Sequence, residues 1–176
     1  MVNNIRRTIL ANHLRHLSIG QITGDEFEEL VMEDITHGFL PAQYYMSPQS
    51  KFDDPAIRPI LEYCWCLYDE LDNSLTGKNE LNNYQIKEIS RLILFLHSGF
   101  EYEWDYIDIT NPLLRFSFKD VLMSIVTLGR HYKERMLTRE QEFEEMKRKG
   151  DFEYWPFKTK AMFETQLNKH PFLAEK

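Results

Sequence analysis

Apolar residues recur three or four positions apart through most of this 176-residue chain, and this spacing is typical of amphipathic helices. The first such stripe runs from Ile5 to Leu17, and the second runs from Phe27 to Ile35. Further stripes predict helices over 59–73, 80–97, 118–136, 138–149 and 160–168. We therefore expect an all-α fold, a single-domain bundle of six or seven helices that covers residues 1–176.

Capping signals and breaker residues place the ends of these helices. Thr23 with Glu26, and Thr138 with Gln141, match the pattern in which a hydroxyl and a side chain three positions later cap a helix start. Between 41 and 55 the chain carries three prolines and a turn signal at 53–55, so we expect a long connection there.

The segment 100–106 has a different pattern, because aromatic and acidic residues alternate in it. A period of two does not fit an amphipathic helix and favours a short strand or an extended loop laid over the helices. Two interpretations of its acids, Glu101, Glu103, Asp105 and Asp108, stay open. They are either the solvated side of a half-buried segment, which we favour, or paired carboxylates for sugar cleavage beside Trp104.

Charge and composition exclude several classes of protein. Hydrophobic residues make up 43% of the chain, which is too apolar for a disordered protein. The net charge of −7 argues against nucleic acids and anionic membranes as partners. No stretch approaches the roughly 20 apolar residues that cross a bilayer, and the first 17 residues lack the apolar core of a signal peptide.

The two cysteines, Cys64 and Cys66, predict a reducing, cytoplasmic setting. On a helix their spacing turns the two thiols to opposite sides, so they can neither form a disulfide nor share a metal ion. We expect Cys64 to be a packing residue, because it lies on a strongly apolar face.

Motifs for catalysis or cofactor binding are absent from the sequence. It contains no phosphate-binding loop, no dinucleotide fingerprint, no nucleophile elbow and no H-E-x-x-H or C-x-x-C pair. The best metal-binding pattern joins His13-x-x-His16 to Asp34-x-x-His37, each on one face of a predicted helix. We interpret these as ordinary surface histidines, and we predict no catalytic residue, no cofactor and no metal site.

Two arginines lie in apolar surroundings, Arg91 between Ile89 and Leu92, and Arg115 in the run 113–118. A buried guanidinium needs a carboxylate partner. We therefore predict that one of these arginines binds the acids of 101–108 and anchors the aromatic segment to the helices.

Two segments carry a resemblance to a known kind of protein. Phe95-Leu-His-Ser-Gly-Phe-Glu-Tyr-Glu-Trp104 and Gly150-Asp-Phe-Glu-Tyr-Trp-Pro-Phe157 resemble a pattern in small uncharacterised bacterial proteins, similar in style to immunity proteins of toxin systems. The resemblance implies a compact, acidic and non-catalytic protein that binds a basic partner. It carries over no catalytic residue.

These observations predict a non-enzymatic protein-binding module, an immunity-like inhibitor of a basic partner. The candidate partner-binding residues are the acids and aromatics of the two resembling segments: Glu101, Tyr102, Glu103, Trp104, Asp105 and Trp155. Two alternatives stay open. One is a structural protein whose aromatic residues cover a homodimer face, and the other is a metal-dependent or carboxylate-dependent hydrolase.

Overall fold

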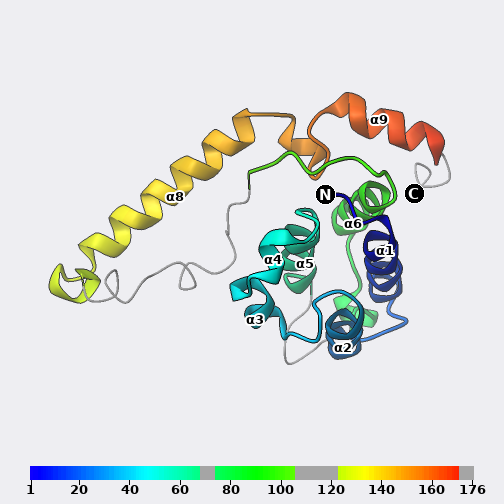
Figure 1. The fold of residues 1–176 in the computed structure, drawn as a ribbon, viewed down its shortest axis with the longest axis horizontal. Helices are drawn as coiled ribbons and strands as arrows, with labels where there is room; N and C mark the ends of the chain where they lie inside the picture. Colours follow the sequence, from blue (N-terminus) through cyan, green and yellow to red (C-terminus); the bar gives the residue numbers. More distant parts are fainter. Residues whose placement is uncertain (68–73, 106–122, 171–176) are drawn as a thin grey trace.

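The computed structural model describes residues 1–67, 74–105 and 123–170. Within those residues every regular element is helical and no strand occurs, which confirms the predicted all-α class. Figure 1 shows a body of packed helices that contains α1 to α6, with α9 beside it and the long helix α8 extending away from it. The described part contains more helical segments than the six or seven expected, because several of them are short.

Several helices begin where capping side chains bind the free N–H groups of the first turn. α1 (Asn4–Ser18) starts after Asn3, whose side chain accepts from the Arg6 N–H. α2 (Gly24–Asp34) starts after Thr23, and both bonds of the predicted capping box with Glu26 are present. α6 (Asn83–Leu96) starts after Asn82 and ends before Gly99, which takes the left-handed conformation (φ 69°) that the predicted helix stop needs.

The expectation of a long connection over 41–55 was wrong. Two short helices lie there, α3 (Pro41–Met46) and α4 (Gln49–Phe52). Pro41 occupies the first turn of α3, where its missing N–H costs nothing. α5 (Ile57–Trp65) then starts close to the predicted position 59, and the predicted residues 68–73 lie outside the described residues.

The helix predicted to start at Thr138 was also misplaced. Gly129 (φ 83°) interrupts the helical conformation. One helix, α8 (Arg130–Arg148), then runs through position 138. The Thr138 hydroxyl donates to the Glu134 carbonyl inside this helix instead of capping a new one. A 3-10 turn (Phe152–Tyr154) and α9 (Lys160–Lys169) complete the described chain, and α9 agrees with the predicted 160–168.

The core forms where the apolar stripes of α1, α2, α5 and α6 meet, and the tail beyond α8 closes over them. Phe157, which follows the cis Trp155–Pro156 bond, is fully buried. Its ring packs edge-on against Phe95 of α6 at 5.1 Å and against Phe163 of α9 at 5.6 Å between centroids. The aromatic tail therefore fixes α9 and the base of α8 to the body.

A fully buried ion pair joins α1 to the turn before α5. Arg7 Nε donates to Asp54 Oδ2 at 2.6 Å, and Arg7 Nη2 donates to Asp54 Oδ1 at 2.8 Å. The third guanidinium nitrogen, Nη1, donates to the Phe100 carbonyl at 2.6 Å. The Arg7 guanidinium thus ties α1 to the start of the aromatic segment through a backbone carbonyl, and not through the acids of the segment, which the sequence predicted as the partners of an arginine.

Arg91 does not bind the acids of the aromatic segment, so the prediction is wrong for this arginine. Arg91 binds Glu88 on its own helix at 2.6 Å, and its Nε donates to the Trp155 carbonyl at 2.5 Å. Arg115 lies outside the described residues. The neighbouring carboxylate, Asp53, instead binds Arg6 at 2.6 Å and accepts from the buried Tyr44 hydroxyl at 2.8 Å.

We expect stability to fall in acid through Asp54. Burial raises the pKa of this carboxyl, but the hydrogen bonds from Arg7, Asn3 and Ala56 outweigh burial and hold the pKa below its ordinary value. Between the folded and unfolded pKa values the unfolded chain binds more protons, so stability rises with pH there. The contribution is complete above the unfolded value of about 3.9 and is lost as the pH falls through the folded value.

Urea unfolding from pH 7 down to pH 2 measures this loss. The wild-type free energy of unfolding should fall below about pH 4, and the fall should be shallower for Asp54→Asn, which has no proton to gain. Equal slopes for the two proteins would contradict the assignment.

Candidate binding site: an aromatic pocket at the base of α8

A pocket of about 570 Å³ opens where α5, α6, the 100–105 segment and the base of α8 come together. Its size is that of a small-molecule or side-chain site. Six aromatic residues from five parts of the chain line it: Tyr63, Tyr84, Tyr102, Phe143, Phe152 and Trp155. The wall is therefore largely apolar, and ring faces are available to a ligand.

Ring contacts and one hydrogen bond hold this wall together. The Trp155 indole N–H donates to the Tyr102 hydroxyl oxygen at 3.0 Å, and the Trp155 ring lies 6.1 Å from the Tyr63 ring between centroids. On the α8 side, Phe143 packs edge-on against Phe152 at 5.5 Å. Trp155 is thereby oriented from two sides before any ligand arrives.

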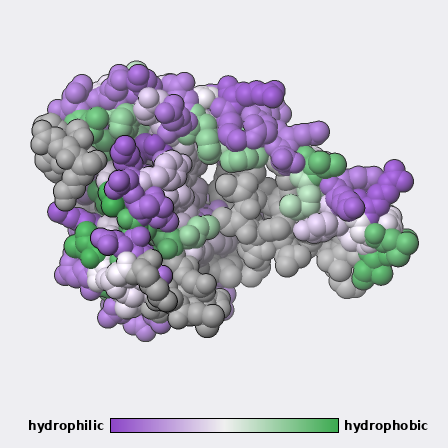
Figure 2. Space-filling view, turned by 180° about the vertical axis from the view of Figure 1, so that it is seen from behind, coloured by the Kyte–Doolittle hydropathy of each residue, from purple (hydrophilic) through white to green (hydrophobic). Residues whose placement is uncertain are grey.

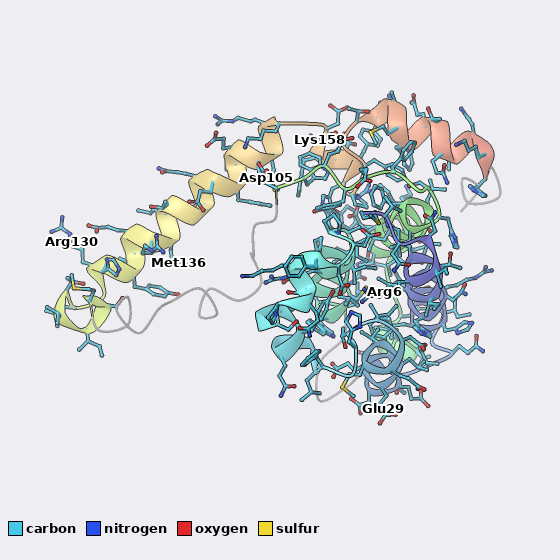
Figure 3. All side chains as sticks on the ribbon, viewed as in Figure 1. Arg6, Glu29, Asp105, Arg130, Met136 and Lys158 are labelled. Atoms are coloured by element: carbon cyan, nitrogen blue, oxygen red, sulfur yellow. The ribbon has the colours of Figure 1, made fainter. Side chains whose placement is uncertain are left out.

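The pocket also contains four carboxylates, and three of them are paired. Glu62 binds Arg58 at 3.2 Å and Glu88 binds Arg91 at 2.6 Å. Asp105 binds Lys149 at 2.7 Å, and this ammonium holds the pKa of Asp105 below its usual value. Figure 3 shows Asp105 at the base of α8. Within the described chain, no ion pair involves the fourth, exposed carboxylate, Glu153.

The partly buried phenols of Tyr63 and Tyr102 remain neutral. Burial raises the pKa of Tyr102 well above its usual range, and burial with the negative charge of Glu88 does the same for Tyr63. A neutral hydroxyl can donate or accept a hydrogen bond to a ligand, but it is a poor general base at neutral pH.

The structure brings together three of the six residues singled out from the sequence. Tyr102, Asp105 and Trp155 all line the pocket. Glu101 and Glu103 point to solvent on the same segment, as its alternation predicted, and Asp108 lies outside the described residues. Trp104 has only 4% of its surface exposed, because its ring packs into the body behind the segment.

Sequence reasoning missed most of the pocket wall. Tyr63 and Tyr84 lie within the predicted helices 59–73 and 80–97 but were not singled out, and Phe152 entered only as part of the segment 150–157. One signal was available in the sequence: Tyr84 lies off the apolar stripe of its predicted helix. The structure leaves it 69% exposed at the start of α6. Nothing in the spacing of these residues shows that they meet.

The histidine pattern does not form a cluster. His13 binds Asp34 at 2.8 Å, whereas His37 binds Asp53 at 3.0 Å. Across the part of the chain that the structure describes, no three histidine, cysteine or acidic residues are placed to hold a metal ion. The two pairs are explained by contacts between neighbouring elements.

The two cysteines differ in exposure, as their spacing predicted. Both are free; Cys64 is buried and Cys66 is exposed and lines the pocket. Burial raises the pKa of the Cys64 thiol far above its usual range, so the thiolate is suppressed and Cys64 acts in packing. Burial and the negative charge of Glu62 raise the pKa of the Cys66 thiol as well, so neither cysteine is an activated nucleophile.

No family model, no curated protein and no solved structure matches this chain. Among the described residues, no helix combines the length and the apolar character that a bilayer-crossing segment requires. The pocket itself is thus the evidence on which a functional proposal rests.

Proposed function

We propose that this chain is a non-enzymatic protein-binding module that receives a lysine or arginine side chain of a basic partner in the aromatic pocket. The observation that carries the proposal is the pairing of aromatic walls with acidic groups at one opening. Aromatic faces attract cations, and the methylene stem of a basic side chain packs well on them. An immunity-like inhibitor, which holds a basic protein, would use such a surface in a reducing cytoplasm.

The charges around the pocket support a cationic partner. Glu101, Glu103 and Glu153 are exposed, and no ion pair involves them within the described chain. Of the nearby lysines, Lys149 binds Asp105 and Lys158 lies 4.1 Å from the Trp104 ring centroid, whereas the exposed Lys87 lines the pocket and is outnumbered by the three exposed glutamates. A basic partner would therefore meet uncompensated negative charge, which speeds and orients association.

The pKa directions of the pocket residues make a hydrolytic site the weaker alternative. General acid–base catalysis needs a carboxyl group or phenol whose pKa lies near neutral pH. Here the pKa of Asp105 is lowered and the pKa values of Tyr63 and Tyr102 are raised, which moves all three away from neutrality. These features suit the recognition of a charge better than the transfer of a proton.

Two synthetic peptides test the proposal. One contains a single arginine flanked by leucines, and the other carries citrulline at that position, which keeps the shape and removes the charge. Titration calorimetry should show at least about tenfold tighter binding of the arginine peptide. Equal affinities would contradict a cation-binding pocket.

Matched variants assign the binding to the pocket. Tyr84→Ala removes an exposed aromatic wall, and Glu153→Gln removes the acid that no ion pair engages within the described chain. Each should weaken the arginine peptide several-fold, and the control Phe52→Ala should not, because Phe52 is exposed on α4 and does not line the pocket. Equal effects of Tyr84→Ala and Phe52→Ala would place the binding elsewhere.

A further inference from the structure

An ammonium group of this chain already lies against the rings on the α8 side of the pocket. The Lys147 Nζ is 4.8 Å from the centroid of the Phe143 ring and 5.9 Å from that of the Phe152 ring. These are distances at which the negative face of a ring attracts a positive charge. Lys147 does not line the pocket itself, so the rings that α5 and α6 contribute, Tyr63 and Tyr84, remain for a ligand.

The oxygen atoms of the pocket are less available than its rings. Three of its four carboxylates are held in ion pairs with an arginine or a lysine, at 2.6–3.2 Å. The Tyr102 hydroxyl oxygen accepts from the Trp155 indole N–H. A lysine ammonium brings three N–H donors and an arginine guanidinium brings five, and a donor that leaves water without a partner costs free energy. A cation without N–H groups avoids this cost.

The methylated form of a lysine side chain is such a cation. Methylation keeps the positive charge, and a trimethylated headgroup has no N–H group and packs its methyl groups on ring faces. The pocket volume of about 570 Å³ accommodates this wider headgroup together with its methylene stem. The lining contains four carboxylates against two basic residues, Lys87 and Arg91, so its balance of charge also favours a cation.

We propose that the pocket selects trimethylated lysine in a segment of the partner protein, with the headgroup against the rings of Tyr63, Tyr84 and Trp155. This inference rests on the proposed function, because it narrows the kind of basic side chain that the pocket receives. The exposed Glu101 and Glu103 lie on the segment that carries Tyr102 but do not line the pocket. They are placed for the residues that flank the lysine, which favours a protein segment over a free quaternary amine as the ligand.

Three peptides test this selectivity. The host is the leucine-flanked peptide of the arginine test, and its central residue is lysine, trimethyllysine or the neutral analogue in which carbon replaces the quaternary nitrogen. In titration calorimetry with the full chain, the trimethyllysine peptide should bind at least about tenfold more tightly than each of the other two. The comparison with lysine isolates the methyl groups, and the comparison with the neutral analogue isolates the charge.

Tetramethylammonium chloride is the probe for a free quaternary amine. It carries the same charged headgroup without the stem and the flanking residues. It should therefore bind at least about a hundredfold more weakly than the trimethyllysine peptide. Equal affinity would overturn the assignment of the ligand to a protein segment.

Variants of Tyr84 show whether a ring face reads the charge. Tyr84 is 69% exposed, so its substitution disturbs the fold little. Tyr84→Leu keeps an apolar side chain without a ring, and it should reduce the preference for trimethyllysine over the neutral analogue several-fold. Tyr84→Phe keeps the ring and should leave that preference within about twofold of the wild type. Equal preferences in the two variants would contradict recognition through this ring.

The control variant addresses a second apolar surface. Ile125, Val126 and Leu128, in the turns before α8, are 68%, 69% and 96% exposed. Figure 2 shows hydrophobic side chains gathered at that end of the molecule, away from the body. Leu128→Asn makes this end more polar, and asparagine tolerates the positive φ of the residue. It should leave the affinities for all three peptides unchanged, and a loss as large as that of Tyr84→Leu would place the binding outside the pocket.

Failure of this inference differs from failure of the proposed function. If the arginine peptide binds more tightly than its citrulline counterpart while trimethyllysine binds no more tightly than lysine, the selectivity is overturned and the cation-binding pocket stands. If arginine and citrulline bind equally and trimethyllysine equals its neutral analogue, the pocket does not read charge, and both proposals fail.

Discussion

Replacing Arg7 by methionine should lower the free energy of unfolding by about 3–5 kcal/mol. The change leaves the Asp54 carboxylate charged and fully buried with only the Asn3 and Ala56 N–H groups as donors. It also removes the donor to the Phe100 carbonyl, which starts the segment that carries Tyr102 and Asp105 to the pocket. Urea unfolding at pH 7 measures the loss.

Two further proteins separate the charge from the packing. Arg7→Met combined with Asp54→Asn should recover a substantial part of the loss, because the amide keeps an acceptor and carries no charge. Arg130→Met, which breaks the exposed pair with Glu134, should cost less than about 1 kcal/mol. A loss below 1 kcal/mol for Arg7→Met would show that the ion pair is open to water.

This ion pair shows why the sequence located an anchor and misassigned its residues. Apolar residues flank Arg91 and Arg115 in the sequence, which favoured them as buried arginines. Arg7, in contrast, follows another arginine near the N-terminus. Arg7 and Asp54 are 47 positions apart, so nothing local links them. Burial of a charge depends on which helices cross at that point, and periodicity does not contain that information.

The start of α2 was predictable because its capping residues follow a segment that is not helical. Thr23 and Glu26 bind each other's backbone as the pattern requires. The same pattern gave a wrong helix start at Thr138. The helix that begins at Arg130 continues through this position, so the Thr138 hydroxyl donates to the Glu134 carbonyl. A capping signature marks a helix start only if the preceding residues leave the helical conformation.

The short helices over 41–55 were missed for a different reason. α3 has no side-chain cap and is six residues long, so its apolar positions never complete a periodic stripe. The fully buried Tyr44 lies in it and donates its hydroxyl to Asp53. A prediction from periodicity needs about two turns of helix. The three prolines of 41–55 also indicated a connection instead of helices.

The candidate site was predictable to the extent that it lies on one segment. The alternation over 100–105 correctly separated an inward aromatic side from an outward acidic side. It could not show which inward residues line a pocket, because the opposite wall comes from Phe143 on α8 and Phe152 in the turn after α8. The pocket is a tertiary feature, and only Tyr102, Asp105 and Trp155 of its lining residues were among the candidates from the sequence.

Trp104→Ala should destabilise the chain by about 3–5 kcal/mol, which is the cost typical of truncating a large buried aromatic side chain. The Trp104 indole N–H donates to the Phe157 carbonyl at 3.2 Å, and its ring packs edge-on against Phe152 at 5.6 Å. A Cβ added to Gly150 would lie 3.0 Å from the same ring, so the chain passes unusually close to it. Thermal and urea unfolding measure the loss.

The control Trp104→Phe keeps most of the apolar volume and loses the hydrogen bond, so it should cost about half as much. It should also leave arginine-peptide binding within about twofold of the wild type, because Trp104 packs behind the pocket and does not line it. Tyr84→Ala should show the reverse, weak effects on unfolding and strong effects on binding. Loss of peptide binding in Trp104→Ala at little cost in stability would contradict this prediction. Trp104 would then belong to the binding surface and not to the core.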